Sequence, residues 1–496
     1  MRPKNKRPFV DINFTLQRVF NKEAFRPLQP EVVLAAIEGH DVFLLAATSF
    51  GKTLCFQLPA FVSSGVTVVV TPLLALMTNQ VSAAQQMGIP TESISSHTPK
   101  SERARIETDL QCGHPRTRLL YVTPELCAMT GFRKLLMTVH RQGQLTRIAI
   151  DEAHCVSQWG HDFRPAYKDL SWLKQNLNCP SVPIMAVTAT ANASVQEDIY
   201  NILGLKKEST KFFMTSSARP NIHFEVQYFS ESSPENGTDD VFPYLVSWLK
   251  KMYQRRRLVL ANAAARGIII PPDFTARIKG IIYVPLRMRA EGLAVALKDE
   301  GISAAAYHAG LDHPTRLKVQ HLFTKTEQGG ANLEESFNII CATTAFGMGI
   351  DMPSVRFVVH YGLSRGLEAF VQEAGRAGRD GKAAQSLVLY TREERDRSMT
   401  RNGLDHAKDR DKNQATTRTN SLQAFVGYCE NTAKCRHQMI ATFFGDDLSK
   451  AVCDFACDVC KEGAKKLKAR KDHGLASDED AMHFTQRESI RHYDDY

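Results

Sequence analysis

The sequence feature that most constrains the fold is a repeated alternation of short apolar runs with stretches long enough for a helix. Each run has the length and β-branched content of a strand buried on both faces. Helix-length gaps between such strands predict right-handed βαβ units and a parallel sheet. The alternation occurs twice, which predicts an α/β fold with two tandem parallel-sheet domains. The runs are residues 42–47, 67–72, 118–125, 147–154 and 183–190, and then residues 279–286, 304–310, 338–345, 356–362 and 386–391.

A polar link near residues 216–232 predicts a division into domains 1–218 and 219–395. Beyond Tyr390 no strand is expected, and a cysteine-bearing region follows at 396–462. The basic and polar tail, 463–496, is typical of disorder. Residues 254–278 show no clear period and are interpreted as a surface insertion or as an error in the translated gene.

Composition excludes several broad classes. With 496 residues and 43% apolar residues, the chain is too long for one small module and too apolar for disorder throughout. It lacks the run of roughly 18 apolar residues that a membrane span needs. The net charge of +9 is compatible with a polyanionic partner. Most of the 11 cysteines are scattered singly, which does not favour a disulfide framework.

Residues 46–53, AATSFGKT, directly follow the first predicted strand and fit a phosphate loop in which Ala replaces the first Gly. Backbone N–H groups and the following helix N-terminus would hold phosphates. Gly51 would let the backbone approach, Lys52 would reach the β/γ-phosphates, and Thr53 would bind Mg²⁺. An ordinary turn remains the alternative. The predicted ATP-binding residues of the loop are Ala46, Ala47, Thr48, Ser49, Phe50, Gly51, Lys52 and Thr53.

The fourth run ends in Asp151 and Glu152, followed by Ala153 and His154. Adjacent carboxylates at a strand end suit a metal and a water: Asp151 would hold Mg²⁺, and Glu152 would orient or deprotonate the attacking water. The alternative is a solvated acidic strand end.

Two arginines of the second domain, Arg376 and Arg379, are candidates for stabilising charge on the transferred phosphoryl group. Because Lys52 lies in the other domain, ATP would bind between the domains, and closure would complete the site. A solvated Arg-rich helix start is the alternative reading.

Cysteines cluster near the end of the sequence. Cys453, Cys457 and Cys460 follow a C-x3-C-x2-C spacing, and Cys429 and Cys435 lie upstream. Four thiolates suit a closed, structural Zn²⁺ site, and five candidates compete for four places. Unpaired reduced cysteines are the alternative.

In their order along the chain, these motifs resemble the RecQ family of superfamily 2 DNA helicases, over roughly residues 14–460. The resemblance rests on the phosphate loop, TPLLALMTNQ (71–80), YVTPE (121–125), DEAH, TAT (188–190) and YHAGL (307–311), and above all on TTAFGMGIDMPSVRFVVH (343–360) and QEAGRAGRDG (372–381). It implies two RecA-like domains, followed by a helical hairpin and a zinc platform.

The resemblance also implies roles for individual residues. Gln29, with Arg26 beside it, would read the adenine, and Gly349, Asp351 and Gln372 would contribute to nucleotide binding. Cys435, Cys453, Cys457 and Cys460 would be the zinc ligands, with Cys429 spare.

Residues 155–168 resemble the aromatic-rich loop of the family, with Trp159, Phe163 and Arg164 at its matching positions. Aromatic and guanidinium groups can stack on unpaired bases at about 1–3 kcal/mol per base. The alternative is that both aromatic residues belong to the core. Because the loop begins directly after His154, contact with a base could be relayed to the ATP site.

The implied activity is ATP-dependent 3′-to-5′ movement on single-stranded DNA and duplex unwinding in nuclear DNA repair and recombination. Departures from the family pattern include Ser49 and Phe50 at positions that prefer Gly, so that Phe50 would hinder the turn or point outward. The 36 residues after Cys460 are too few for the winged helix and helical domain of many relatives, so unwinding is expected to be weak or to need a partner. An RNA helicase and a non-catalytic nucleic-acid-binding scaffold are the alternatives.

Overall fold

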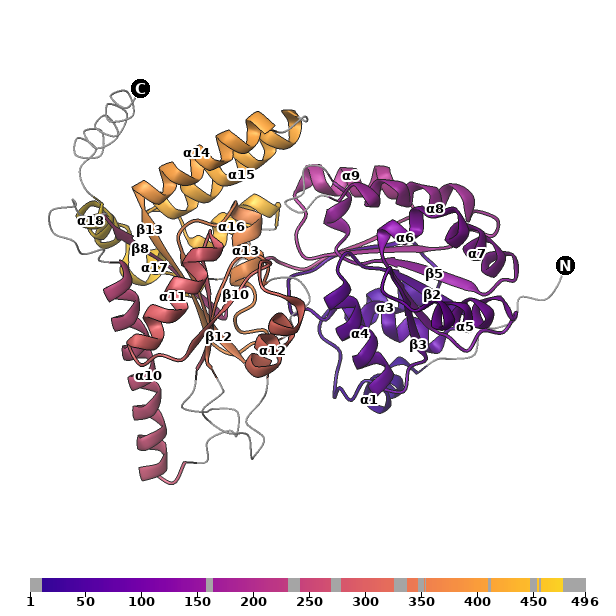
Figure 1. Cartoon of the computed structure of the whole chain (residues 1–496), viewed down its shortest axis with the longest axis horizontal. Helices are drawn as coiled ribbons and strands as arrows, with labels where there is room; N and C mark the ends of the chain where they lie inside the picture. Colours follow the sequence, from indigo (N-terminus) through magenta and orange to yellow (C-terminus); the bar gives the residue numbers. More distant parts are fainter. Residues whose placement is uncertain are drawn as a thin grey trace. The chain divides into compact units, whose positions relative to one another are not determined.

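The computed structural model describes residues 11–157, 164–230, 241–268, 278–324, 337–346, 352, 354–408, 412–446, 453–454 and 456–475. The chain divides into two compact units, Met1–Ser217 and Ala218–Tyr496. Each unit is built on a parallel sheet, which confirms the predicted α/β class with two parallel-sheet domains (Figure 1). Among the helices in these ranges, none is both long and apolar enough to cross a membrane.

The first unit has a seven-stranded sheet in the order β3-β4-β2-β5-β6-β1-β7, and all its pairings are parallel. The five predicted runs become β1, β2, β4, β5 and β6, and two further strands, β3 and β7, form the edges. The strands are β1 (Val42–Leu45), β2 (Val66–Val70), β3 (Thr91–Ile94), β4 (Leu119–Val122), β5 (Leu145–Ile150), β6 (Ile184–Thr188) and β7 (Lys211–Met214).

Helices cover both faces of this sheet, because alternate residues of its central strands are buried in different cores. Phe43 and Leu45 of β1 pack into one core, whereas Val42 and Leu44 pack into the other. The first core is closed by α5 (Lys100–Gln111), α6 (Pro124–Ala128), α7 (Thr130–Arg141), η1 (Ala153–Val156), η2 (Pro165–Leu170), α8 (Ser171–Asn176) and α9 (Ala193–Leu203). The second is closed by α1 (Ile12–Arg18), α2 (Gln29–Ile37), α3 (Lys52–Val62) and α4 (Leu74–Gln86).

The second unit has a six-stranded parallel sheet in the order β10-β11-β9-β12-β13-β8. Ile281 and Ile282 of β9 likewise enter different cores. The strands are β8 (Ile222–Phe229), β9 (Lys279–Tyr283), β10 (Ala304–Tyr307), β11 (Ile339–Ala342), β12 (Val355–Tyr361) and β13 (Ala384–Thr391). The helices up to the last strand are α10 (Val241–Ala265), α11 (Arg287–Asp299), α12 (His313–Thr324) and α13 (Leu367–Ala374).

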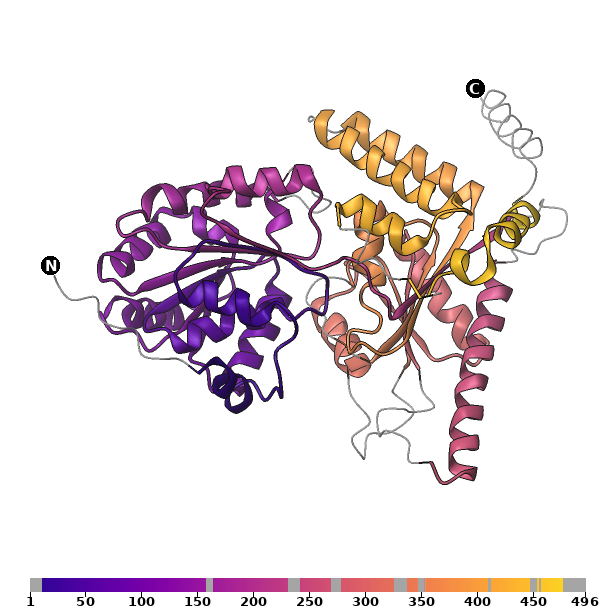
Figure 2. The same cartoon turned by 180° about the vertical axis from the view of Figure 1, so that it is seen from behind.

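After β13 the chain is helical within the described residues. Helices α14 (Arg392–Lys408) and α15 (Lys412–Glu430) lie side by side (Figure 2). They are followed by α16 (Arg436–Phe444), α17 (Asp458–Glu462) and α18 (Ala464–Gly474). The segment before α17 docks on edge strand β8: the N–H of Phe224 donates to the carbonyl of Ala456 at 3.2 Å. An edge strand that would expose unpaired backbone groups is thereby covered.

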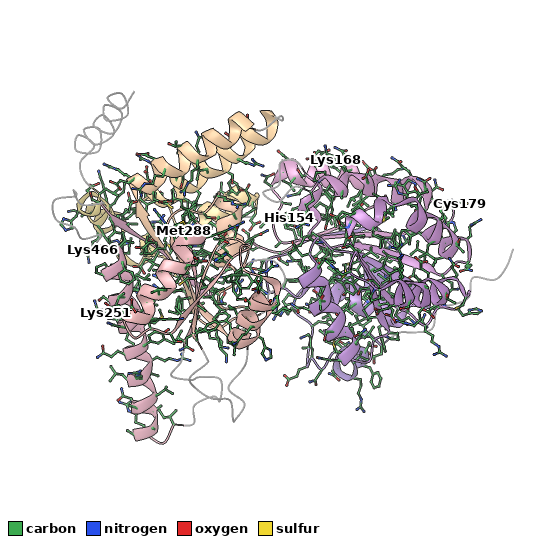
Figure 3. All side chains as sticks on the ribbon, in the orientation of Figure 1. His154, Lys168, Cys179, Lys251, Met288 and Lys466 are labelled. Atoms are coloured by element: carbon green, nitrogen blue, oxygen red, sulfur yellow. The ribbon has the colours of Figure 1, made fainter. Side chains whose placement is uncertain are left out.

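Residues 254–265 of the predicted insertion continue helix α10, and the interpretation of 254–278 as an insertion stays a prediction. Two predictions about organisation are wrong. Residues 222–229 of the expected link form strand β8, whose alternating burial shows one face in the core. The tail is not disordered where α18 lies, because Leu467 is fully buried and Arg470 donates to the carbonyl of Val226 at 2.9 Å. Figure 3 labels Lys251 on α10 and Lys466 on α18.

A buried ion pair joins the C-terminal helices to each other. Arg436 Nε donates to Asp458 Oδ1 at 2.8 Å and Nη2 donates to Oδ2 at 3.0 Å, and both side chains are fully buried. The Asp458 carboxylate also accepts from the N–H of Val226 at 3.0 Å, so the pair anchors α16 and α17 to β8.

Replacing Arg436 by Met should strongly destabilise the second unit. Removing one partner leaves Asp458 charged inside the protein, which typically costs about 3–5 kcal/mol. Chemical unfolding of Arg436→Met measures the loss. Lys250→Ala is the matched control, because Lys250 and Glu300 form an ion pair that is 53% and 42% exposed and should contribute less than about 1 kcal/mol. Equal unfolding midpoints for the two variants would contradict the prediction.

Candidate nucleotide site and zinc cluster

The predicted phosphate loop connects β1 to α3 in a tight turn. Gly51, the residue before the helix, has φ +88°, and Ser49 has φ +79°. Lys52 begins the helix and folds back over the loop, where its Nζ donates to the carbonyl of Ala46 at 3.0 Å. The loop therefore encloses the Lys52 ammonium group next to a helix N-terminus, an arrangement that suits phosphate oxygens.

Gln29 supports this loop from outside. Its Nε2 donates to the carbonyl of Phe50 at 2.7 Å, and its Oε1 accepts from the N–H of Arg26 at 2.8 Å. A Cβ on Gly51 would lie 2.7 Å from Gln29 Nε2, so both the positive φ and the close approach require glycine there. Phe50 neither prevents the turn nor points fully outward, because its side chain is partly buried against the core under α2 and α3.

The paired carboxylates lie where β5 ends. Asp151 is 5% exposed; its Oδ2 accepts from Gln80 Nε2 at 3.2 Å and its Oδ1 from the N–H of Glu152 at 3.0 Å. Burial and, to a smaller extent, the neighbouring Glu152 carboxylate raise the pKa of Asp151 to about 7, although the hydrogen bond from Gln80 and the charge of Lys52 act in the opposite direction. A cation placed here would stabilise the charged form, so the site suits a metal bound to phosphate. The sequence analysis did not assign a role to Gln80, although Gln80 ends the string TPLLALMTNQ at 71–80.

His154 ties this strand end to the next one. Its Nδ1 lies 2.9 Å from Thr188 Oγ1 at the end of β6, and Thr188 Oγ1 donates to the carbonyl of Thr190 at 3.2 Å. Glu152 has φ +49°, a left-handed conformation that is uncommon outside glycine and is held here by the surrounding contacts. Figure 3 labels His154 in the first unit.

Parallel pairing brings these groups to one edge of the sheet. Strand β6 lies between β1 and β5, and both pairings are parallel. The phosphate loop, the threonine motif and the paired carboxylates therefore follow the carboxyl ends of neighbouring strands, where ligands bind in open α/β sheets. Together they could hold a triphosphate, a divalent cation and an attacking water.

Of the predicted aromatic loop, Trp159 and Phe163 lie outside the described residues. Arg164 is half-buried, and its Nη1 donates to the carbonyl of Pro72 at 2.6 Å, in the turn between β2 and α4. The guanidinium is thus bound to protein in this structure, and its contact with nucleic acid stays a prediction.

In the second unit, Gln372 lies on α13, and Arg376 and Arg379 follow in the turn after this helix. Arg376 is 8% exposed. Its guanidinium lies near the buried Tyr283 hydroxyl, where it partly offsets the upward shift that burial causes in the pKa of Tyr283. Gly349 and Asp351 lie outside the described residues.

The cysteine cluster assembles at α16 and α17. The donor atoms of Cys435, His437, Cys453 and Cys457 all lie within 4.8 Å of one another. Burial raises the pKa of the Cys453 thiol to about 12, and its thiol neighbours contribute to the raised pKa of Cys457. A cation would be needed to deprotonate such crowded thiols, and three sulfurs with an imidazole suit Zn²⁺. The cluster therefore fits the predicted zinc site.

Cys460 and His437 compete for the fourth position. The N–H of Cys460 donates to Cys457 Sγ at 3.5 Å, so Cys460 lies beside the cluster. His437, a donor that the sequence analysis missed, stands two residues after Cys435 in the CRH string. Cys429, the predicted spare, is buried and lies outside the cluster.

Comparison with known families covers the chain in three parts. Residues 26–199 match the DEAD/DEAH box helicases, residues 266–381 the helicase conserved C-terminal domain, and residues 394–461 the RecQ zinc-binding region. The fold and the site thus define a helicase with two RecA-like domains and a zinc-binding region.

Curated relatives extend the match over almost the whole sequence. The chain is 35% identical to the RecQ-like DNA helicase blm-1 of Caenorhabditis elegans and 37% identical to the ATP-dependent DNA helicase Q5 of Mus musculus, over 94% and 92% of its length. It spans 43% and 44% of those relatives. It is also 33% identical to the ATP-dependent DNA helicase Q1 of Rattus norvegicus, over 93% of this chain and 67% of that one. The chain belongs to the RecQ family of DNA helicases, which confirms the predicted resemblance.

Solved structures agree at the level of the fold. The DEAD-box helicase Mss116 bound to ssRNA has a TM-score of 0.56 at 18% identity, over 77% of this chain and 76% of that one. The Mycobacterium smegmatis helicase Lhr bound to ssDNA has a TM-score of 0.52 at 19% identity, over 77% of this chain and 47% of that one.

Zinc content should distinguish the cluster from the other cysteines. Cys457→Ala is expected to lose the bound zinc and to lower the thermal stability of the second unit, because a small metal site supplies folding energy. Cys429→Ala should keep about one zinc per chain, although Cys429 is also buried. A chromogenic zinc assay on the purified variants measures this. Zinc retained by Cys457→Ala would contradict the assignment.

Proposed function

We propose that this chain is an ATP-dependent DNA helicase that moves 3′ to 5′ along single-stranded DNA with Mg²⁺-ATP as its fuel. The observation that carries the proposal is the gathering of Lys52, Asp151 and Glu152 at the carboxyl ends of parallel strands in one sheet. Family membership supports DNA as the track, since the relatives are named DNA helicases.

In this proposal the first unit holds the nucleotide. Lys52 exchanges its bond to the carbonyl of Ala46 for phosphate oxygens, while the N–H groups of residues 47–53 bind the remaining oxygens. Thr53 and Asp151 would hold Mg²⁺, which supplies charge neutralisation at the phosphates. Glu152 orients the attacking water, and Gln80 keeps the Asp151 carboxylate aimed at the metal position.

Residues of the other unit contribute to turnover. Arg376 and Arg379 stabilise the charge that builds on the transferred phosphoryl group. An arginine in this role can raise the rate of hydrolysis about 10³- to 10⁵-fold. Gly349, Asp351 and Gln372 add contacts to the nucleotide, and Gln29 and Arg26 read the base. Since these groups come from both units, hydrolysis would be coupled to domain movement.

The track is proposed to run near the aromatic-rich loop. Trp159 and Phe163 would stack on bases, and Arg164 would add a cationic contact. The loop starts directly after His154, whose contact with Thr188 joins the ends of β5 and β6. Base contact could thus alter the position of Glu152. As the resemblance to the RecQ family implies, the protein would act in DNA repair and recombination in the nucleus.

Wild-type protein should displace a strand from a duplex with a 3′ single-stranded tail, and leave the matched 5′-tailed duplex intact. Lys52→Ala should displace neither, because it lacks the phosphate-binding ammonium group. Steady-state ATPase run in parallel with single-stranded DNA and RNA of equal length tests the alternatives. Stronger stimulation by RNA would favour an RNA helicase, and wild-type hydrolysis no higher than that of Lys52→Ala would favour a non-catalytic scaffold.

Trp159→Ala should retain basal ATP hydrolysis and lose most of the stimulation by single-stranded DNA. The lost stacking interaction is worth about 1–3 kcal/mol, or roughly 5- to 150-fold in DNA affinity. Trp172→Ala is the control, because Trp172 also packs against a guanidinium in the first unit, that of Arg133. The rate is measured at saturating DNA, and stimulation equal to wild type in Trp159→Ala would exclude the coupling role.

A further inference from the structure

The Arg-Pro-Asn segment just before β8 binds the turn that carries the two arginines of the second unit. Arg219 Nη1 donates to the carbonyl of Gly375 at 3.0 Å, and Nη2 donates to the carbonyls of Ala377 and Gly378 at 3.0 and 2.8 Å. Asn221 Nδ2 donates to the carbonyls of Gly378 and Lys382, both at 2.9 Å. Five hydrogen bonds thus connect this segment to the turn.

One of the three carbonyls that Arg219 binds belongs to Gly375, which caps the C-terminal end of α13, and the other two lie in the turn that follows. The last carbonyls of a helix lack intrahelical partners and carry the negative end of its dipole, which a guanidinium satisfies well. One planar group with five donors can serve three carbonyls at once. The turn fits closely as well, since Gly378 has φ +59° and a Cβ there would lie 2.5 Å from Asn221 Nδ2.

The same segment is held from the other side by the cysteine cluster. His437 Nε2 donates to the carbonyl of Arg219 at 3.1 Å, and the His437 ring packs edge-on against Phe224 at 4.9 Å. Its other ring nitrogen, Nδ1, is buried and has no hydrogen-bond partner in the described part of the chain. The donor atoms of His437 and Cys457 lie within 4.8 Å of each other.

We propose that Arg219 is a positioning residue for ATP hydrolysis. It fixes the turn that presents Arg376 and Arg379, and His437 transmits the folded state of the zinc cluster to this turn through the backbone of Arg219. The proposal rests on the proposed function for the role of the two arginines. It assigns the zinc cluster a part in nucleotide turnover in addition to its structural part.

The chemistry explains why a lysine would not serve at position 219. An ammonium group is a point charge on a flexible stem and cannot span three carbonyls in a plane. Without the guanidinium, the carbonyls of Gly375, Ala377 and Gly378 would turn toward water, and the arginines would move with them. A displacement of about 1 Å can cost roughly 100-fold in rate.

The first experiment compares Arg219→Ala, Arg219→Lys and Arg470→Ala in the full chain. Arg470 is the matched control, because it also anchors β8 through a backbone carbonyl, while its hydrogen bonds within the described part of the chain go to Val226, Glu462 and Asp458 and not to the turn. Arg219→Ala should lower kcat for DNA-stimulated ATP hydrolysis about 10- to 100-fold, with KM for ATP and zinc content close to wild type. Arg219→Lys should be intermediate, and Arg470→Ala should keep the wild-type kcat.

Hydrogen exchange of residues 375–384 reports the turn directly, without ATP turnover. The N–H of Gly378 donates to the carbonyl of Val355 at 2.9 Å, and that of Gly381 to the carbonyl of Gly378 at 3.0 Å, so both amides are protected while the turn is held. Exchange should rise in Arg219→Ala and stay unchanged in Arg470→Ala. Unchanged exchange with wild-type kcat in Arg219→Ala would overturn the proposal.

The zinc link is tested with His437→Phe, which keeps an aromatic ring beside Phe224 and removes the Nε2 donor. Exchange of residues 375–384 should rise in this variant, and its zinc content is measured on the same sample. Exchange equal to wild type would overturn the part assigned to His437, whatever the zinc content.

Arg376→Ala and Arg379→Ala distinguish a failure of the proposed function of these arginines from a failure of the positioning role of Arg219. If these variants keep the wild-type kcat, the proposed role of the arginines fails, while a rise in exchange in Arg219→Ala still shows that the turn is held. If they lose turnover and Arg219→Ala does not, only the positioning role fails.

Discussion

The candidate nucleotide site depends on the parallel pairing of strands that are buried on both faces. In the first unit β1, β6 and β5 run side by side in one direction, so the turns after them meet at one edge. None of these turns could serve alone: the Lys52 loop offers positive charge, Asp151 and Glu152 offer negative charge, and Thr188 connects to His154. The sheet fixes the distances between these turns.

Charged groups of both signs lie at this edge of the sheet. Burial and the Glu152 carboxylate raise the pKa of Asp151, which marks the position as unfavourable for an isolated negative charge. Lys52 meanwhile is bound to a backbone carbonyl of its own loop. A phosphate group would bind Lys52, and a divalent cation would bind Asp151. The free energy of these two interactions would favour nucleotide binding.

Continuous apolar runs in the sequence predicted the central strands. Strands that are partly exposed or buried on one face only were missed. Edge strand β7 is half exposed, and β8 has alternating burial within a polar stretch, so neither resembles a doubly buried strand. Helix α18 is basic, and only its contacts with β8 and the core order it. Local motifs likewise pointed to Lys52, Asp151 and Cys457. Gln80 contacts Asp151 71 positions away, and His437 contacts Arg219 218 positions away, separations that no local spacing encodes.

The second unit shows how a short segment can be constrained from both sides. Arg219 uses its side chain toward the turn after α13 and its carbonyl toward His437. Strand β8, which follows at Ile222, pairs with β13 on one edge and accepts the cysteine segment on the other. The zinc cluster and the arginine turn are therefore joined through the residues that directly precede β8, His437 by the carbonyl of Arg219 and the turn by its guanidinium. The zinc cluster, which comes near the end of the sequence, therefore contacts the same residue, Arg219, as the turn whose arginines are proposed to act on the nucleotide.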